Sequence, residues 1–227
     1  MTRTALVTGA TRGIGREVAR QLKQAGFGVF ITGRDQPLLG ALMDELGCGG
    51  QAMDLADPEA PARLFEQARG ALGRVDVLVN NAGFNQRKDP VVNITAADLD
   101  ASYAVNVRAP ILLAREALKD MATRRSGHIV NVLSSIVHAK MENYSVYSSM
   151  KYALHGFTGC LVKEARQVGV KVTAVYPGGV NTTFRPNARP DYLRPESAAR
   201  MIVQCVTAPE DVVVHELTFR PMVETNF

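Results

Sequence analysis

The sequence predicts one domain of the α/β class, a doubly wound, mostly parallel sheet of seven strands with helices on both faces. Three observations lead to this prediction. Short apolar runs rich in β-branched residues alternate with longer helical patterns along the chain. Most of these runs lack the alternation of a half-exposed strand, which is typical of strands buried on both faces. The 227 residues are 46% hydrophobic and contain no linker or repeat, so residues 1–227 are expected to share one core.

The elements follow one another as strand–helix units, which favour a parallel sheet. The predicted strands cover residues 4–8, 28–32, 51–53, 75–79, 128–133, 170–176 and 212–216. The predicted helices cover residues 13–25, 36–46, 58–71, 97–121, 145–167 and 195–206. Asp57 and Pro58 are typical of an N-cap followed by a proline at the first helical position. Gly26 and Gly169 stand where glycine commonly ends a helix.

Residues 178–195 interrupt this alternation with a segment rich in proline and arginine. They predict a long loop between the sixth strand and the last helix. Long loops in compact domains are commonly lids or binding loops, so we expect a substrate loop or lid here. A disordered insertion is the alternative.

Composition excludes several classes of protein. Lys and Arg number 26 against 22 Asp and Glu, and no basic cluster is long enough to indicate a nucleic-acid partner. The three cysteines are far apart and form no CxxC pair, so neither a disulfide framework nor a metal site is expected. No apolar run approaches about 18 residues, and the first residues resemble a strand rather than a signal peptide. We therefore expect a cytoplasmic protein with no membrane partner.

A glycine-rich turn, TGATRGIG from Thr8 to Gly15, follows the first strand and opens the first helix. Gly9 permits a tight turn, Gly13 permits close approach of the backbone to a pyrophosphate, and Gly15 permits close packing of helix and strand. The helix N-terminus then directs unpaired N–H groups at the phosphates. The context predicts a Rossmann-type dinucleotide site, although the spacing differs from GxGxxG and turn chemistry alone is the simpler alternative.

The end of the second strand indicates which dinucleotide is bound. An acidic residue there holds a ribose 2′-hydroxyl, whereas an arginine accommodates a 2′-phosphate. The strand ends in Gly33 and Arg34, with no carboxylate at Gly33, and Asp35 is typical of the N-cap of the next helix. Arg12 in the glycine turn is a second candidate cation. The two arginines favour NADP over NAD, unless both are simply solvated.

Tyr147 and Lys151 lie four residues apart on a predicted helix and so share one face. Tyrosine has a pKa near 10, and a nearby ammonium favours its phenolate and lowers that pKa. The pair then supplies a proton donor and acceptor for a carbonyl/alcohol couple. An ordinary surface pair is the alternative.

Ser134 and Ser135 end the fifth strand, where ligands of open α/β sheets bind. A serine hydroxyl there is able to orient a carbonyl oxygen and stabilise charge on it. Asn106 lies in a helical stretch and is a candidate to hold a proton-relay water. A capping serine and a helix-kinking asparagine are the structural alternatives.

In order and spacing, these motifs resemble those of the short-chain dehydrogenase/reductase family. The resemblance runs from residue 4 to about 217 and rests on Thr8–Gly15, Asp54, Asn80–Gly83, Asn106, Ser134, Tyr147, Lys151 and Pro177–Gly178. It implies that Tyr147 is the acid/base, that Lys151 binds the nicotinamide ribose and lowers the tyrosine pKa, and that Ser134 positions substrate. Asn106 would hold the relay water. A homodimer or homotetramer through the two long helices is implied as well.

The resemblance also implies a cofactor site. The residues expected to bind NADP(H), several of them taken from the glycine turn and the strand ends, are Gly9, Thr11, Arg12, Gly13, Ile14, Gly15, Arg34, Asp54, Leu55, Asn81, Ala82, Gly83, Tyr147, Lys151, Pro177, Gly178, Val180 and Thr182.

Two departures from the family pattern affect the site. The family serine commonly stands thirteen residues before the tyrosine as the second of a Ser-Ser pair, whereas here that spacing selects Ser134, the first, and leaves Ser135 in reserve. The C-terminus is short and lacks the common Gly-Gly ending, which puts in doubt a substrate wall built from the tail.

The sequence thus predicts an NADP(H)-dependent oxidoreductase acting on a small carbonyl or alcohol substrate, with a 3-oxoacyl thioester as one candidate. A non-catalytic dinucleotide-binding regulator is the alternative.

The expected substrate pocket is lined by Phe84, Asn85, His138, Met141, Tyr144, Gly179 and the 181–194 loop. Three loop arginines, Arg185, Arg189 and Arg194, indicate an anionic substrate group, although solvated charges are the simpler interpretation.

Overall fold

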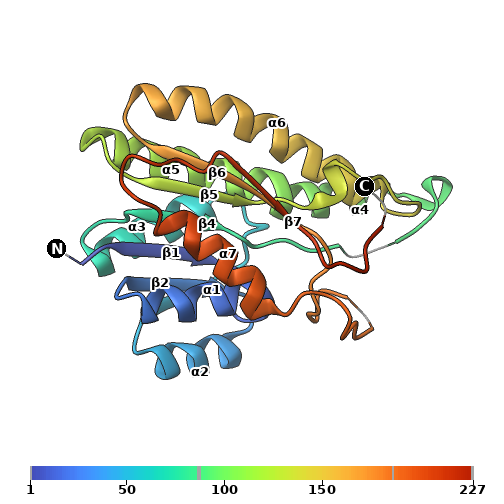
Figure 1. Cartoon of the computed structure of the whole chain (residues 1–227), viewed down its shortest axis with the longest axis horizontal. Coiled ribbons are helices and arrows are strands. Elements are labelled where there is room, and N and C mark those ends of the chain that lie inside the picture. The colour runs from blue at the N-terminus through green and yellow to red at the C-terminus, as the bar shows by residue number, and fades with distance from the viewer. Residues whose placement is uncertain (1, 86–87, 186, 226–227) are drawn as a thin grey trace.

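The computed structural model describes residues 2–85, 88–185 and 187–225. Its centre is a parallel sheet of seven strands in the order β3-β2-β1-β4-β5-β6-β7 (Figure 1). The strands are β1 (Thr4–Thr8), β2 (Gly28–Gly33), β3 (Gly49–Ala52), β4 (Val77–Asn80), β5 (His128–Val132), β6 (Lys171–Pro177) and β7 (Glu216–Phe219). The predicted doubly wound α/β fold is confirmed.

Helices cover both faces of the sheet (Figure 1). One layer holds α1 (Gly13–Gln24), α2 (Gln36–Leu46) and α7 (Pro195–Val206), and the other holds α3 (Ala60–Leu72), α5 (Ala109–Thr123) and α6 (Ser145–Gln167). Side chains alternate along β1, so Val7 enters the first core while Leu6 enters the second. Every residue of β1 and β5 is buried, which explains why neither strand shows the alternation of apolar and polar residues found in half-exposed strands.

The strand order reverses at β1, which pairs with β2 on one side and β4 on the other. In an open parallel sheet this reversal leaves a crevice at the carboxyl ends of the two diverging strands. The glycine turn follows β1, and Asn81–Gly83 follow β4. The topology therefore brings two of the predicted motifs to one place.

Buried polar side chains join the middle of the sheet to α6. Asn80 and Asn131 are register partners on β4 and β5, and Asn80 Nδ2 donates to Asn131 Oδ1 at 2.9 Å. Asn131 Nδ2 donates in turn to Thr158 Oγ1 at 3.0 Å. Asn80 Nδ2 also donates to the Pro110 carbonyl at 3.1 Å.

The last strand is the clearest error of the sequence prediction. Residues 212–214 are apolar, but the strand is Glu216–Phe219 rather than 212–216. The carbonyls of Val212 and Val214 accept hydrogen bonds from the side chains of Lys171 and Thr173, so this stretch is bound by side chains before the ladder begins at Glu216. Smaller differences of two residues or fewer affect the ends of β2, β3, β4, β5 and β6.

The predicted helix 97–121 is interrupted. It forms α4 (Ala96–Tyr103), a π-helical turn (Ala104–Arg108) and α5. Asn106, in the middle of this turn, donates from Nδ2 to the Ser102 carbonyl at 3.1 Å and to the Phe84 carbonyl at 3.0 Å. π-turns occur often at functional sites, and this one places a polar side chain beside the β4 loop.

The predicted helix caps are partly confirmed. Gly26 and Gly169 have φ angles of +84° and +74° just after helix ends, the conformation that favours glycine. The Asp57 prediction is wrong, because α3 begins at Ala60 and its N-cap is Glu59. Asp57 Oδ1 instead accepts the Glu59 N–H within the preceding turn. No helix in the described part of the chain is long and apolar enough to cross a membrane.

Candidate active site

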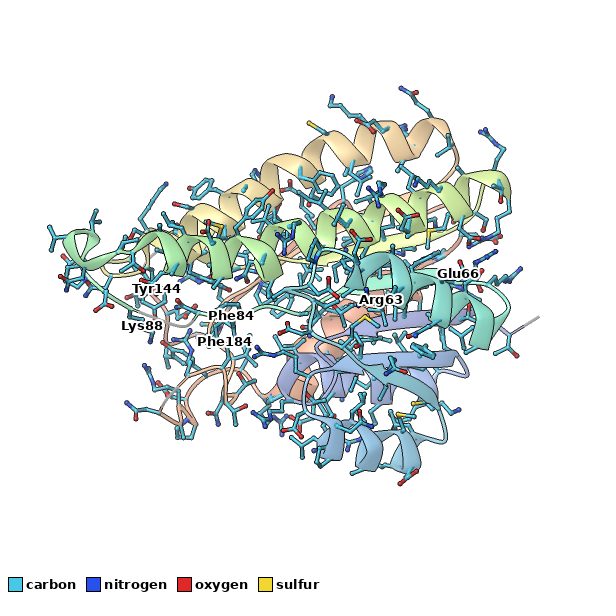
Figure 2. The ribbon with its side chains drawn as sticks, turned by 180° about the vertical axis from the view of Figure 1, so that it is seen from behind. Arg63, Glu66, Phe84, Lys88, Tyr144 and Phe184 are labelled. Atoms are coloured by element: carbon cyan, nitrogen blue, oxygen red, sulfur yellow. The ribbon has the colours of Figure 1, made fainter. Side chains whose placement is uncertain are left out.

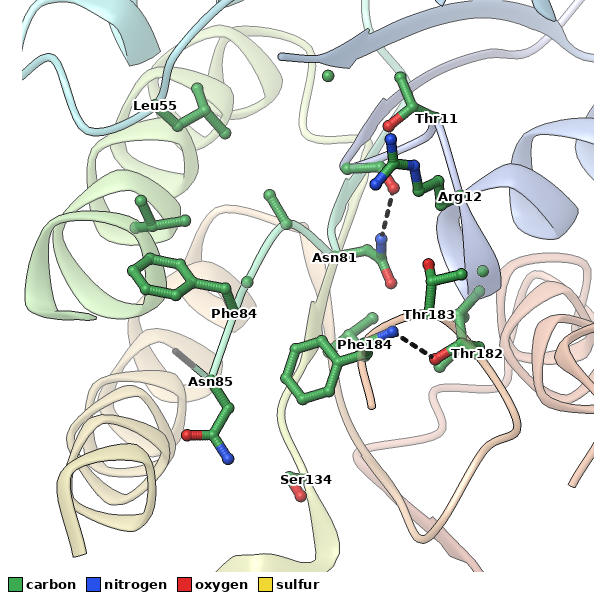
Figure 3. A pocket seen from close by; sticks show the side chains of 18 of the residues that line it. Thr11, Arg12, Leu55, Asn81, Phe84, Asn85, Ser134, Thr182, Thr183 and Phe184 are labelled. Atoms are coloured by element: carbon green, nitrogen blue, oxygen red, sulfur yellow. Dashed lines mark hydrogen bonds between the residues drawn. The ribbon is translucent and has the colours of Figure 1, made fainter. Parts of the chain in front are cut away.

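A cleft of about 410 Å³ opens at the carboxyl ends of β1, β2, β4, β5 and β6. Figure 3 shows Thr11 and Arg12 toward one end of this cleft, Ser134 toward the other, and Asn81 between them. Most residues predicted to bind the cofactor line it: Gly9, Thr11, Arg12, Gly13, Ile14, Arg34, Asp54, Leu55, Asn81, Ala82, Gly83, Tyr147, Lys151, Pro177, Val180 and Thr182. Gly15 and Gly178 do not line it.

Two glycines of the glycine turn, Gly9 and Gly15, lie at positions that have no room for a side chain. A Cβ at Gly9, where φ is +65°, would lie 2.8 Å from Ala82 Cα. A Cβ at Gly15 would lie 2.3 Å from the Gly9 carbonyl oxygen, which explains why this glycine supports the turn from behind the cleft. α1 begins after Arg12 without a side-chain cap, so no side chain occupies its first N–H groups. Uncapped N–H groups at a helix start suit an anion, and a pyrophosphate therefore fits here.

Asn81 fixes the turn to the end of β4. Its Nδ2 donates to the carbonyl oxygens of Thr8 and Gly9, at 3.0 and 3.3 Å. Thr8 Oγ1 accepts the backbone N–H groups of Asn81 and Ala82, both at 3.0 Å. These bonds hold the glycine turn rigid before any ligand binds.

Two cations lie where β2 ends. Arg34 and Arg12 both line the cleft, and Arg12 forms an ion pair with Asp35. Asp35 is also the N-cap of α2, as predicted, since its side chain accepts the Leu38 N–H at 3.1 Å. A Cβ at Gly33 would lie only 2.4 Å from Thr11 Cγ2, so the Thr11 side chain occupies the space where an acidic side chain at this position would begin.

The predicted acid/base residues meet at the other end of the cleft. Tyr147 and Lys151 of α6 and Ser134 after β5 all line it. Lys151 is buried, lies 5.7 Å from the centroid of the Tyr147 ring, and donates from Nζ to the Val132 carbonyl at 3.0 Å. The two side chains therefore share one face of α6, as their spacing predicted.

Burial governs the titration of this pair. It raises the pKa of Tyr147 to about 12, against the lowering effects of a hydrogen bond from Ser134 and the charge of Arg185. It also lowers the pKa of Lys151 to about 8. The effects that lower the Tyr147 pKa come from Ser134 and Arg185 rather than from Lys151, so the expectation that Lys151 lowers the tyrosine pKa stays a prediction.

Asn106 lies beside the cleft rather than on its lining. Its Nδ2 is bound by carbonyl oxygens, but its Oδ1 is buried without a hydrogen-bond partner among the described residues. A Cβ at Gly83 would lie 2.8 Å from that oxygen and 3.6 Å from Lys151 Nζ. An unsatisfied buried acceptor near an amine suits a bridging water.

A second, smaller cavity of about 60 Å³ adjoins the cleft at Tyr147 and Ser134. Met141, Tyr144 and Gly179 line it as expected, whereas Phe84 lines the main cleft and Asn85 lines both. His138 lines neither and packs on the ring of Tyr176 with centroids 4.9 Å apart. Ser135 lines only this second cavity.

The C-terminal tail does reach the second cavity, because Arg220 and Glu224 line it. They follow β7, and no local motif marks them as site residues. Phe184 and Arg185 of the 178–195 loop line both cavities, and the Phe184 ring lies 5.8 Å from that of Tyr147. Arg189 and Arg194 line neither.

The fold and the cleft are typical of oxidoreductases that use a dinucleotide, and comparison with known proteins agrees. The family model for short chain dehydrogenase matches residues 3–193. An uncharacterised oxidoreductase of Staphylococcus aureus strain MRSA252 is 31% identical over 225 residues, which cover 96% of each chain. The chain belongs to the short-chain dehydrogenase/reductase family.

Solved structures of similar proteins contain the expected dinucleotide. The closed form of a serine dehydrogenase complexed with NADP⁺ has a TM-score of 0.90 at 27% identity, over 98% of this chain and 96% of that one. A metagenomic short-chain oxidoreductase in complex with NADP has a TM-score of 0.87 at 32% identity, over 98% of both chains.

Proposed function

We propose that this protein is an NADP(H)-dependent carbonyl reductase or alcohol dehydrogenase with Tyr147 as its acid/base. The observation that carries the proposal is the convergence of Ser134, Tyr147 and Lys151 on a cleft whose other end is the glycine turn. A bound nicotinamide dinucleotide supplies or accepts a hydride. The side chains of this protein must then supply or accept the proton of the substrate hydroxyl and orient the substrate oxygen atom.

Tyr147 holds that proton. With its pKa near 12, the phenol is protonated at neutral pH and serves as a proton donor to a carbonyl oxygen. The Ser134 hydroxyl, whose oxygen accepts the Ile136 N–H at 3.2 Å, is hydrogen-bonded to Tyr147, and the substrate oxygen replaces the phenol as the acceptor of its proton when substrate binds. Lys151 holds the ribose side of the cofactor and, together with a water bound at the Asn106 Oδ1, carries the proton onward.

NADP rather than NAD is proposed because Arg12 and Arg34 lie together in the cleft without an acidic residue at Gly33. NADP(H) should bind at least about tenfold more tightly than NAD(H), a difference of about 1.4 kcal/mol. The Thr11 side chain fills the space beside Gly33, so an aspartate at position 33 also requires a smaller residue at position 11. Gly33→Asp with Thr11→Ala and Arg34→Gln should invert the preference, and equal dissociation constants in the unmodified protein would contradict it.

Residues 178–195 act as the substrate loop in this proposal, because Phe184 and Arg185 line both cavities.

A homodimer or homotetramer is proposed through the two long helical segments, where Leu99, Tyr103 and Tyr152 are exposed. Light scattering of the purified protein measures that state, and a monomer would contradict it.

The test of function is a panel of small ketones and aldehydes with NADPH, following loss of its absorbance. Turnover that disappears in Tyr147→Phe supports the proposal. A protein that binds NADPH but turns over none of the panel would instead be the non-catalytic regulator.

A further inference from the structure

The cavity beside Tyr147 gives information about the substrate. It shares Ser134, Tyr147, Phe184 and Arg185 with the main cleft, so a substrate whose reacting carbon lies at the phenol extends into it. Its volume of about 60 Å³ holds roughly four to six water-sized groups, at about 10–15 Å³ each. That space accepts a short polar end of a molecule and no bulky tail.

Four charged side chains line this cavity, and two of them, Arg220 and Glu224, form an ion pair with each other. Arg220 Nε donates to Glu224 Oε2 at 2.9 Å, and their side chains are only 5% and 14% exposed. Glu224 Oε1 also accepts the Gly179 N–H at 3.0 Å. The one carboxylate on the lining is thus occupied by an arginine and a backbone donor, and the pair adds no net charge.

The other two, Lys88 and Arg185, are cations with no carboxylate partner among the described residues. Lys88 Nζ lies 5.0 Å from the centroid of the Tyr144 ring, and Arg185 Cζ lies 4.9 Å from that of Tyr192. Figure 2 shows Lys88, Tyr144 and Phe184 gathered at one end of the molecule. Ring contacts hold the cations in place but leave their N–H donors and their charge available.

Arg189 shows the contrast within the same loop. Its Cζ lies 4.0 Å from the same Tyr192 ring, but its Nε and Nη2 donate to both carboxylate oxygens of Asp191, at 2.9 and 2.7 Å. It lines neither cavity. Of these two arginines stacked on one ring, only Arg185 faces the site with an uncompensated charge.

We propose that Arg185 and Lys88 bind a carboxylate of the substrate in the cavity beside Tyr147. The substrate is then a small hydroxy acid or its oxo-acid counterpart, as a free acid rather than an ester or thioester. Arginine suits this ligand because its planar fork matches a carboxylate with two parallel hydrogen bonds. The inference rests on the proposed reductase function and adds the chemical class of the substrate.

The test uses matched pairs of compounds with NADPH: 2-oxo and 3-oxo acids of four to six carbons and the methyl ester of each. For at least one pair, kcat/KM for the acid should exceed that for the ester by about tenfold or more, since a charged hydrogen bond is lost in the ester. Arg185→Gln and Lys88→Gln should each lower kcat/KM for the acid by about tenfold and lower it much less for the ester, so the ratio of acid to ester should fall.

The chain supplies matched controls. Arg189→Gln removes an arginine from the same ring, and Lys140→Gln removes a lysine that lies 5.7 Å from the Tyr152 ring outside both cavities. Both should preserve the preference for acids. A loss as large in Arg189→Gln as in Arg185→Gln would assign the effect to loop structure and overturn the proposal.

A measurement on the unmodified protein needs no variant. With an ester as substrate, butanoate should inhibit at least about tenfold more strongly than butanamide, which has the same shape without the charge. Equal inhibition, or equal turnover of acids and esters, would overturn the carboxylate site while leaving the reductase function intact. No turnover of any acid or ester by a protein that does reduce a ketone or aldehyde of the first panel would also overturn the carboxylate site. Binding of NADPH with no turnover of any of these compounds would overturn the proposed function itself.

Discussion

The Arg12 guanidinium and the Asp35 carboxylate form an ion pair at the edge of the cleft, with 2.7 Å between Nη2 and Oδ2. The acceptor for which Arg12 is proposed, a 2′-phosphate, must therefore compete with Asp35. Exposed ion pairs of this kind are worth about 0.2–1 kcal/mol. The pair should thus moderate the proposed preference for NADP without abolishing it.

Asp35→Asn should tighten NADP⁺ binding relative to NAD⁺ by up to about fivefold. The change frees Arg12 and removes a negative charge, while asparagine keeps the N-cap of α2. Titration of both cofactors at low salt measures the ratio, and the gain should shrink as salt rises. An unchanged ratio would show that Arg12 does not reach the 2′-phosphate.

Tyr147→Phe should lower turnover by about 10²–10⁴-fold while leaving NADPH affinity within about twofold. The variant removes only the phenolic oxygen, so the contact of the ring with Phe184 persists. Steady-state kinetics and cofactor titration separate the two effects. Near-normal turnover would remove Tyr147 from the mechanism.

Ser134→Ala should lose more activity than Ser135→Ala. Ser134 lines both cavities and lowers the pKa of Tyr147 through a hydrogen bond, whereas Ser135 lines only the second cavity. Parallel kcat measurements on one substrate compare the variants directly. The reverse order would make Ser135 the substrate-orienting hydroxyl.

Much of this site was predictable because its signals are local. The glycine turn, Tyr147 with Lys151, and Ser134 each combine a residue pattern with a neighbouring strand or helix end. Arg220 and Glu224 carried no such signal, since only the path of the chain after β7 brings them to Gly179. The interruption at Asn106 and the start of β7 depend on hydrogen bonds to distant segments, which no sequence window contains.

Lys151→Met should stabilise the fold at pH 7 and weaken cofactor binding. The folded pKa is about 8 against an ordinary 10.5, so the charged amine opposes folding below pH 8, and that cost disappears as pH rises from 8 to 10.5. Removing the buried charge should raise the free energy of unfolding at pH 7 by about 3 kcal/mol. Loss of the hydrogen bond to the Val132 carbonyl should reduce that increase by roughly 1 kcal/mol. Denaturant unfolding at pH 7 and pH 10 measures it; a gain that did not shrink at pH 10 would contradict the titration.

His128→Gln should reduce the loss of stability in acid. His128 is buried beside Thr173, with Nε2 2.7 Å from Oγ1, and burial lowers its pKa from 6.5 to about 3. The neutral ring therefore stabilises the fold above pH 6.5, and this contribution is lost as pH falls toward 3. Between pH 6.5 and 4 the wild type should lose about 3 kcal/mol more than the variant. Parallel losses in denaturant unfolding would show that other groups drive acid unfolding.

The hydrogen bonds of Asn80, Asn131 and Thr158 restrict how the chain can assemble. The central strands β4 and β5 are short and their apolar residues are all aliphatic, so apolar packing alone discriminates poorly between their possible alignments. If one strand shifted past the next, the side-chain amides of Asn80 and Asn131 would lose these hydrogen bonds in an interior without water. Each unsatisfied group would cost about 1–3 kcal/mol. These three side chains thus reject misaligned sheets while the molecule folds, and so they protect the alignment of strand ends on which the cleft depends.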